Sequence, residues 1–524
     1  MKKIMTTLAA IALVACAAFA QDCPKREFRG AWLHIVGNQK IKTMTTDQVK
    51  TWITSTLDTL QSINCNAVLF QVRPQADAFF PSELEPWTRF LTGVQGKAPS
   101  PYWDPLQFAI DECHKRGMEL HAWLNPYRVT SNDKEVLTPD HLYYKHPEWF
   151  VKYGKQLYFD PGVPACREHT VNVIKDIVRR YDVDAIHFDV YFYPYPEAGK
   201  DFPDDASFKK YPNGFKPDQR ADWRRNNVTL LIKEINSAIK EIKPWIRFGI
   251  SPFGIHRNKS AAYPEGSATN GLSTYEALYA DIPLWCKEGY IDYNVPQLYW
   301  KIGHKLADYE TLIKWWNEGN FGGHLYIGQS LGSLQEPDLK NPNIPQLGAK
   351  MDLERNLPNV HGNVWWPGWS LATDPRCHYV TDSLRVHYQK YPALIPAYTH
   401  IDNVAPDAVA TFKAEGRKLR WEPTPTDDPM QEAVFYVVYR FKADEQIDLS
   451  DSRHILAITR DKSLTLGCGK HQCKDGKQCK DVKHQCKDGK QCKDGKHQCP
   501  KFKYVVTVTD HCWNESEPSA AIEL

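Results

Sequence analysis

The 524-residue sequence predicts an α/β fold, a closed (β/α)8 TIM barrel, followed by a small all-β sandwich. Between residues 26 and 400, apolar runs of strand length alternate with amphipathic segments of helix length. The strand-like runs number eight, which is the number that closes a parallel barrel. Beyond residue 401 the helical pattern stops and short alternating runs follow. We therefore expect a barrel over residues 26–400 and a sandwich over residues 401–524.

Each predicted strand is an apolar or alternating run, and each is followed by a helix-like segment. In chain order the strands cover residues 28–36, 67–74, 119–127, 185–194, 247–253, 293–300, 324–331 and 362–370. The helices cover residues 46–62, 104–116, 167–181, 222–242, 275–288, 307–317, 347–355 and 380–391. The first helix begins with Thr-Thr-Asp, which is capping chemistry. The second has Pro105 in its first turn and ends at Gly117.

Three long insertions make the predicted barrel larger than the ~250 residues of a typical one. They cover residues 74–102, 128–165 and 195–221, after the second, third and fourth strands. Each insertion follows a strand and precedes a helix, so it lies at the carboxyl ends of the strands. Barrel enzymes build their active sites at that rim.

Polar and aromatic residues occupy positions that alternation assigns to the barrel interior. They are Trp32 and His34 on the first strand, Gln71 and Arg73 on the second, His121, Trp123, Asn125 and Tyr127 on the third, and His187, Asp189 and Tyr191 on the fourth. A purely structural interior would prefer Val, Ile and Leu. A single such residue is explained as a core polar group with a partner. Convergence from four strands instead predicts a site.

Carboxylates at this rim fit the hydrolysis of a glycosidic bond, which uses one ionised and one protonated carboxyl group. Asp189 is the candidate nucleophile or general base, and we expect Arg73 and His187 to keep it ionised. The candidate general acid is Asp77, with Glu85 as the next choice.

The remaining candidates are rings that would stack on sugars and polar groups that would bind hydroxyls. The substrate-binding candidates are Trp32, His34, Gln71, Arg73, Trp123, Asn125, Tyr127, Arg128, Asp160, His187, Tyr191, Gln297, Tyr299, Trp300 and Trp366. For Asp160, which precedes Pro-Gly, a turn role is favoured over catalysis. Motifs for phosphate binding, a nucleophilic Ser elbow or metal ligation do not appear, so we expect no cofactor or metal.

Several motifs in this region match one family. They are residues 28–32 (FRGAW), 71–74 (QVRP) with Asp77, 83–87 (ELEPW), 121–128 (HAWLNPYR), 159–162 (FDPG), 187–189 (HFD), 191–194 (YFYP), 223–225 (WRR) and 296–300 (PQLYW). Over residues 26–400 the chain resembles the bacterial glycosyl hydrolase-like family 10. The resemblance implies a barrel and an exported glycosidase. A characterised member is a lipoprotein that cuts peptidoglycan glycan strands lacking stem peptides.

One departure from the family pattern concerns the fourth strand, where the family has two consecutive Asp residues. Here the second position is Val190. Alternation places Val190 in the helix layer, so Asp189 would carry the chemistry and activity would survive. If the family's second Asp carries the reaction, this chain is a catalytically inactive glycan-binding protein of the cell envelope.

The N-terminus predicts export. Lys2 and Lys3 precede an apolar stretch that ends in Ala-Phe-Ala at residues 18–20, the pattern of a cleaved signal peptide over residues 1–20. Alternatively, residues 13–16 form a lipobox that would place a lipid anchor on Cys16. We expect the periplasm or the cell surface, with an outer-membrane lipoprotein as the second form. We expect no transmembrane segment. With 65 basic and 63 acidic residues, we also expect no nucleic-acid partner.

The C-terminal runs resemble a fibronectin type III-like sandwich, with Trp421 as a core residue and Tyr504 near the penultimate strand. Residues 468–499 interrupt it with a Cys- and Lys-rich, low-complexity insertion that contains two near-identical 13-residue copies. The Cys residues scattered through the rest of the chain show no framework spacing, so we expect them to be buried thiols.

Overall fold

The computed structural model describes residues 24–190, 192–334, 346–466 and 501–524. The chain divides into two compact units, Met1–Asn403 and Val404–Leu524, each of which is described by itself. The predicted signal peptide and the insertion at 468–499 lie outside the described residues.

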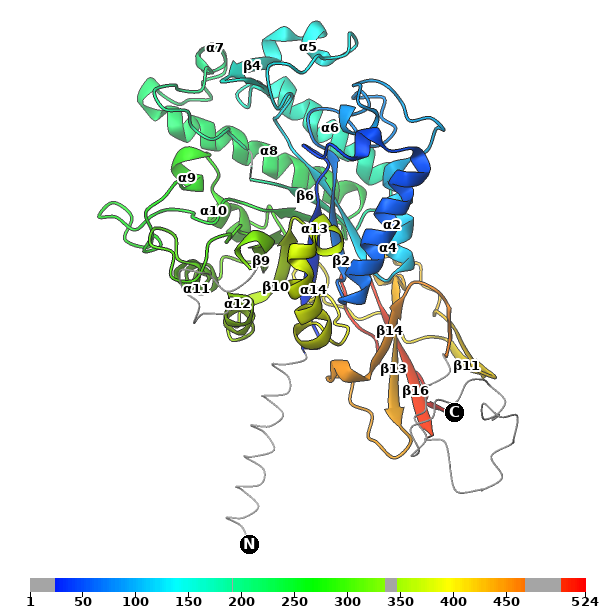
Figure 1. Cartoon of the computed structure of the whole chain (residues 1–524). Helices are drawn as coiled ribbons and strands as arrows, with labels where there is room; N and C mark the ends of the chain where they lie inside the picture. Colours follow the sequence, from blue (N-terminus) through cyan, green and yellow to red (C-terminus); the bar gives the residue numbers. More distant parts are fainter. Residues whose placement is uncertain (1–23, 191, 335–345, 467–500) are drawn as a thin grey trace, which may run out of the picture. The chain divides into compact units, whose positions relative to one another are not determined.

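The first unit is a closed barrel of eight parallel strands, which confirms the predicted fold class (Figure 1). Its strands are β1 (Phe28–Leu33), β2 (Ala67–Arg73), β3 (Glu119–Leu124), β6 (Ala185–Phe188), β7 (Arg247–Ile250), β8 (Tyr293–Asn294), β9 (His324–Ser330) and β10 (Val360–Trp366). Each strand pairs with the next in this order, and β10 closes the barrel against β1. Each overlaps a predicted strand and is shorter than it, and β10 begins two residues earlier than predicted.

Helices surround the barrel (Figure 1). They are α2 (Thr46–Ser62), α3 (Arg89–Thr92), α4 (Pro105–Lys115), α5 (Leu142–Lys145), α6 (Pro164–Arg180), α7 (Asp205–Lys210), α8 (Arg220–Ile242), α9 (Thr274–Ala277), α10 (Ile282–Lys287), α11 (Tyr309–Gly319), α12 (Gln346–Arg355), α13 (Trp369–Thr373) and α14 (His378–Ser383). Among the described helices, none is long and apolar enough to span a bilayer. A capping box at Thr45 begins α2, and the Asp104 side chain caps α4.

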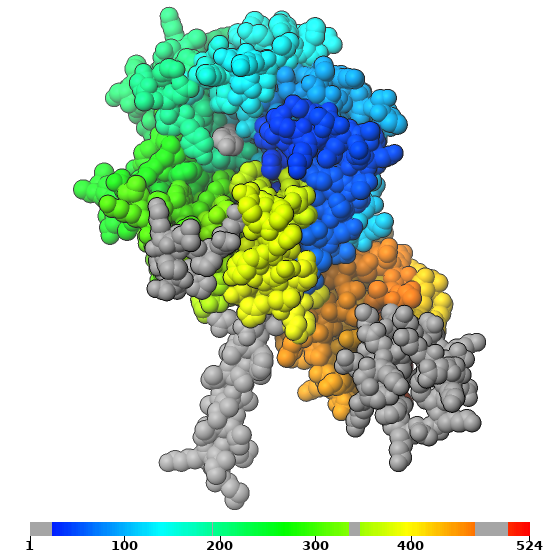
Figure 2. All heavy atoms as spheres, viewed as in Figure 1, coloured from blue at the N-terminus to red at the C-terminus, as the bar shows by residue number. Residues whose placement is uncertain are grey.

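The closure of the barrel brings the two ends of the unit together. In Figure 2 the surface near residues 30–60 adjoins that near residues 365–390. Inside this junction, Trp52 of α2 stacks on Trp369 of α13 with ring centroids 3.7 Å apart.

Local chain geometry interrupts three of the predicted elements. The helix expected over 275–288 is divided into α9 and α10, because Tyr279 takes a left-handed φ of 55° and Pro283 lies in the first turn of α10. The helix expected over 380–391 begins as α14 and continues as a π-helical turn, Leu384–Tyr388. The last barrel strand ends at Trp366 because Pro367 follows it.

The insertion after β3 contains an unpredicted hairpin, β4 (Phe150–Tyr153) and β5 (Gln156–Phe159). Its sequence signal is a two-residue Gly-Lys turn between alternating residues, with Gly154 at a φ of +58°. The hairpin joins the end of β3, since the Phe159 N–H donates to the Tyr127 carbonyl over 2.8 Å.

Side chains alternate along the barrel strands as predicted. The outward set, which includes Leu33, Phe70, Leu120, Ile186, Phe248 and Ile327, belongs to one hydrophobic cluster with the helices. The interior instead holds large rings. Glycines make room for them: a Cβ at Gly249 would lie 1.9 Å from the Tyr293 ring, and one at Gly328 would lie 3.0 Å from Trp32.

The second unit consists of two antiparallel sheets. The first sheet contains β11 (Thr411–Glu415), β12 (Lys418–Glu422) and β15 (Ser463–Thr465), and the second contains β14 (Ile455–Thr459), β13 (Phe435–Lys442), β16 (Phe502–Thr509) and β17 (Ile522–Glu523). Trp421 and Tyr504 belong to the buried cluster of this unit, and Trp421 lies 5.6 Å from Tyr436. The fibronectin type III-like assignment stays a prediction.

Cysteines in both units are buried free thiols, as expected. They are Cys65, Cys113, Cys166, Cys286, Cys377 and Cys512 among the described residues.

Replacing Gly249 with alanine should destabilise the barrel by about 1–3 kcal/mol, because the added methyl overlaps the ring of Tyr293. That ring cannot move away freely, since its hydroxyl is bonded to two histidines. Thermal unfolding followed by circular dichroism measures the effect. Gly332→Ala is the matched control, because its Cβ would meet no atom closer than 3.6 Å. Equal melting temperatures for the two variants would contradict the packing argument.

Candidate active site

A chain of hydrogen bonds begins at the first strand and crosses the barrel interior. The Trp32 indole Nε1 donates to His187 Nε2 over 3.1 Å, so this ring nitrogen is an acceptor. The proton of His187 is therefore on Nδ1, which donates to the Tyr293 hydroxyl over 3.1 Å. Burial lowers the pKa of His187 well below its ordinary value, so the imidazole is neutral.

The same chain continues to a buried ion pair. The Tyr293 hydroxyl donates to His121 Nδ1 over 2.8 Å, and His121 Nε2 donates to Glu119 over 2.9 Å. Glu119 also pairs with Arg247. Burial opposes ionisation of Glu119, but Arg247 and the His121 hydrogen bond hold its pKa below the ordinary value. The Trp32 indole at one end can only donate, and the Glu119 carboxylate at the other end can only accept. These two ends determine which atom donates in each hydrogen bond between them.

Asp189 lies directly after β6 at the carboxyl ends of the strands, where it is 4% exposed. Asn125, which follows β3, donates from Nδ2 to Asp189 Oδ1 over 3.0 Å. The Asn125 side-chain oxygen accepts the backbone N–H groups of Arg128 over 2.7 Å and of Tyr127 over 3.3 Å. Asn125 therefore has a fixed orientation, with its amide directed at the carboxylate.

The structure corrects the expected source of charge at Asp189. Arg73 forms a bidentate pair with Glu85, Nε to Oε2 at 2.7 Å and Nη2 to Oε1 at 2.5 Å. Its third nitrogen, Nη1, donates to the Asn125 carbonyl at 2.5 Å. Because His187 is neutral, neither expected cation supplies charge to Asp189 directly. The amide of Asn125 takes that place.

Glu85, the second candidate acid, is 5% exposed. In addition to Arg73 it contacts His169 Nε2 at 3.0 Å. Burial opposes ionisation, but Arg73 and His169 lower the pKa of Glu85 to about 2. The group stays ionised at neutral pH and has no proton to donate, so its geometry is that of a structural anion.

Asp77, the first candidate acid, has no exposed surface. Burial raises its pKa to about 7, while Gln95 donates to its Oδ2 over 3.1 Å. A carboxyl of this kind can hold a proton near neutral pH, but in this structure it has no contact with the outside. The Asp160 carboxylate accepts the Gly162 N–H over 2.8 Å, which is a turn interaction, and burial raises its pKa to about 6.

Rings from three strands gather at the rim. The rings of His34 and Trp366 lie 4.7 Å apart, and Trp123 meets Trp366 edge-on at 6.1 Å. His34 and Trp366 are half-buried, and burial lowers the pKa of His34 to about 4. A neutral imidazole and two indoles, inclined to one another at 51° and 74°, form an aromatic wall whose individual ring faces could stack on sugars.

Three further candidates come from the sixth predicted strand, residues 293–300, and follow the shorter β8. Gln297, Tyr299 and Trp300 are half-buried. The Gln297 amide donates to the Ser251 hydroxyl over 3.0 Å, and Trp300 packs edge-on against Phe253 at 5.2 Å.

Other predicted residues have structural contacts. Tyr127 belongs to the hydrophobic cluster and does not face the rim, because β3 ends at Leu124 and alternation ends with it. The Gln71 side chain accepts the backbone N–H groups of Ile35 and Val36, both over 2.8 Å. Tyr191 lies outside the described residues.

Val190 is also placed differently from the expectation. β6 ends at Phe188, and among the described residues Phe188 and Phe192 join the hydrophobic cluster whereas Val190 does not. Val190 is buried, but it lies two residues beyond the end of β6, so the alternation of the strand does not define which layer it belongs to.

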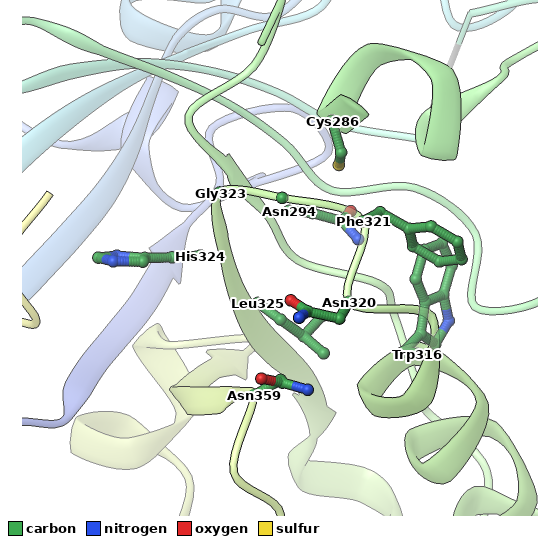
Figure 3. A pocket seen from close by; sticks show the side chains of 10 residues that line it. Cys286, Asn294, Trp316, Asn320, Phe321, Gly323, His324, Leu325 and Asn359 are labelled. Atoms are coloured by element: carbon green, nitrogen blue, oxygen red, sulfur yellow. The ribbon is translucent and has the colours of Figure 1, made fainter. Parts of the chain in front are cut away.

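Two cavities differ in size and position. One of about 280 Å³ lies at the carboxyl ends of the strands and is lined by Arg128, Tyr153, Gln156, Tyr158, Pro194, Tyr195 and Glu197. Apart from Arg128, these residues were not predicted from the sequence, because they come from the unpredicted hairpin and from the loop after β6. The other measures about 20 Å³ at the opposite end of the barrel and is large enough for about one water. In Figure 3 the His324 side chain points away from it.

Comparisons with known proteins agree with this geometry. A family model described as Glycosyl hydrolase-like 10 matches residues 27–344. Glycosyl hydrolase YngK of Bacillus subtilis is 40% identical over 437 residues, which cover 80% of this chain and 84% of that relative. Glycosyl hydrolase DigH of Escherichia coli K12 is 38% identical over 326 residues, which cover 59% of this chain and 73% of that relative.

Similar solved structures include two sugar-acting proteins. The glycoside hydrolase domain of PgaB from Bordetella bronchiseptica has 12% identity and a TM-score of 0.44, covering 69% of this chain and 99% of that one. Alpha-L-fucosidase isoenzyme 2 from Paenibacillus thiaminolyticus has 14% identity and a TM-score of 0.40, covering 69% and 49%.

Asp77→Asn should change the pH dependence of stability. The folded-state pKa of Asp77 is raised to about 7 from an ordinary value of 3.8, so between these values the folded state holds a proton that the unfolded state has lost. The wild type therefore loses stability as the pH rises through this window, and the variant does not. Urea unfolding at pH 4 and pH 8 should show the wild type losing up to about 4 kcal/mol relative to the variant. Asp133→Asn, which changes an exposed rim residue, is the control, and its stability should depend on pH as that of the wild type does.

Proposed function

Because the chain belongs to the glycosyl hydrolase-like 10 family, we propose that it is an exported glycoside hydrolase acting on peptidoglycan glycan strands or a related polysaccharide. The observation that carries the proposal is the carboxylate of Asp189, which lies at the carboxyl end of β6 and accepts a hydrogen bond from Asn125. Active sites of barrel enzymes are built at these strand ends.

Asp189 acts in its ionised form in either of two roles. As a nucleophile it would attack the anomeric carbon, and as a general base it would take a proton from the attacking water. Donation from the Asn125 amide favours the ionised form and holds Oδ1 in place. The low exposure of the group strengthens its electrostatic effect on the developing oxocarbenium charge.

The rings of His34, Trp123 and Trp366 support a sugar as the substrate. Two indoles and a neutral imidazole present apolar faces that match the C–H faces of a pyranose, while Asp189 and Asn125 supply polar groups beside them. Small-molecule sites commonly combine aromatic walls with a few polar groups in this way.

The predicted export of the chain supports peptidoglycan as its substrate. The N-terminal pattern predicts transport across a membrane, by cleavage after residue 20 or by lipid attachment at Cys16. A glycosidase delivered to the cell envelope meets peptidoglycan there. The relatives from Bacillus subtilis and Escherichia coli are named glycosyl hydrolases, which supports the reaction class.

A second candidate function is glycan binding without cleavage. The observation that favours it is the second position of the fourth-strand pair, where a buried Val190 stands in place of a carboxylate. In addition, Glu85 is held ionised and Asp77 is enclosed, so neither is placed to protonate a leaving group in this structure.

Asp189→Asn should lower the release of reducing ends from stem-free glycan strands by on the order of 10³-fold or more, because the amide can neither attack carbon nor take a proton. Binding of the strands to the variant should persist, since the side chain keeps its size. Asp374→Asn is the matched control, as Asp374 is a rim carboxylate engaged with Arg376, and it should keep wild-type rates.

Two outcomes would contradict this proposal. Equal rates for the wild type and Asp189→Asn would remove Asp189 from the reaction. Glycan binding by the wild type with no new reducing ends would establish the second candidate function instead.

A further inference from the structure

The cavity of about 280 Å³ has walls from three parts of the chain. The hairpin β4–β5 supplies Tyr153, Gln156 and Tyr158, the loop after β6 supplies residues 194–197, and Arg128 follows β3. Small-molecule sites span about 300–1,000 Å³, so this cavity lies near the lower end of that range. Its volume suits a single sugar ring and not an oligosaccharide.

Three of the seven residues that line the cavity are tyrosines. Tyr153 and Tyr158 are buried, while Tyr195 is 40% exposed at the opening. The Tyr195 ring is supported edge-on by Phe253 at 6.2 Å, and Phe253 in turn contacts Trp300 at 5.2 Å. Tyr195 therefore presents a held aromatic face to the cavity, continuous with the predicted substrate-binding Trp300.

The polar groups are fixed and include one cation and one anion. Arg128 donates from Nε and Nη2 to the Pro74 carbonyl over 3.1 and 3.0 Å. Glu197 is tied to the hairpin, because its backbone N–H donates to the Tyr153 hydroxyl over 2.6 Å, and its carboxylate pairs with Lys200 at 2.7 Å. Arg128 and Glu197 are the two charged residues of the lining and have opposite signs, so the lining itself has no net charge and suits an uncharged ligand rich in hydrogen-bonding groups.

The cavity is connected to Asp189 by a short path of contacts. Arg128 lines the cavity, and its backbone N–H donates to the Asn125 side chain, whose amide donates to Asp189. A sugar in the cavity would therefore lie on the same rim of the barrel as Asp189, one residue pair away from the Asn125 amide.

We propose that this cavity is a glycan subsite that binds one uncharged pyranose ring, such as an N-acetylhexosamine, stacked on Tyr195 and bonded by Arg128 and Glu197. The proposal rests on the proposed function for the identity of the ligand as a glycan, but it concerns binding and not cleavage. Because the hairpin forms one wall, the insertion after β3 selects the sugar bound there.

The test measures binding in the Asp189→Asn background of the full chain, so that turnover does not interfere. The probe is the β-1,4-linked tetramer of N-acetylglucosamine, titrated by calorimetry. Tyr195→Ala should raise the dissociation constant of the tetramer about tenfold. Tyr195→Phe keeps the ring and should change that constant by less than about threefold. Tyr144→Ala is the matched control, because Tyr144 is 57% exposed on α5 and does not line the cavity.

A second probe tests the charge preference. Tetragalacturonate carries a carboxylate on each ring, and the balanced charges predict that it binds no more tightly than the neutral tetramer. Tighter binding of tetragalacturonate would overturn the assignment to an uncharged ring. Equal affinities for Tyr195→Ala and Tyr144→Ala, or no binding of the tetramer by the parent, would overturn the subsite itself.

These outcomes are separate from those of the proposed function. If the tetramer binds in a Tyr195-dependent way but the wild type releases no reducing ends, the subsite stands and the hydrolase proposal fails. If the wild type cleaves glycan but Tyr195→Ala binds like the control, the reverse holds.

Discussion

The chain of hydrogen bonds from Trp32 to Glu119 is the interaction on which the active face depends. It joins side chains of β1, β3, β6 and β8, and its charged end is closed by Arg247 of β7. Buried polar groups are costly unless they are hydrogen-bonded. Along this chain each donor from Trp32 to His121 meets an acceptor, which holds together the strands whose ends carry Asn125 and Asp189.

A second network holds the rim above it. The buried pair of Arg73 and Glu85 joins the end of β2 to the insertion that follows, and Arg73 also bonds the carbonyl of Asn125. A buried ion pair contributes little net stability, but removing one partner leaves an uncompensated charge and is costly. The pair therefore acts mainly to hold the Asn125 backbone, and through it the amide that meets Asp189. Of the polar side chains at the strand ends, Arg73, Glu85 and Asn125 hold other groups in position, and Asp189 is the candidate for the reaction itself.

Local pattern was sufficient to predict the barrel, because period-2 runs and capped amphipathic segments are properties of neighbouring residues. The same reasoning located Asp189 and Asn125. It was wrong for Tyr127, since β3 ends at Leu124 and alternation has no meaning beyond a strand end. The partner of Arg73 was not predictable either, because Glu85 reaches it through a loop whose path depends on tertiary contacts. The hairpin β4–β5 was not predicted, although its two-residue Gly-Lys turn is a local signal for a hairpin.

Gly249 and Tyr293 illustrate how closely two neighbouring strands are coupled. The ring of Tyr293 occupies the space that any side chain at position 249 would need, and its hydroxyl joins His121 to His187. In evolutionary terms we expect the two positions to change together. A relative with a larger residue at position 249 would need a smaller one at position 293, and it would then lack the hydroxyl that links the two imidazoles. Relatives that differ at both positions are therefore expected to have a different hydrogen-bond network inside the barrel.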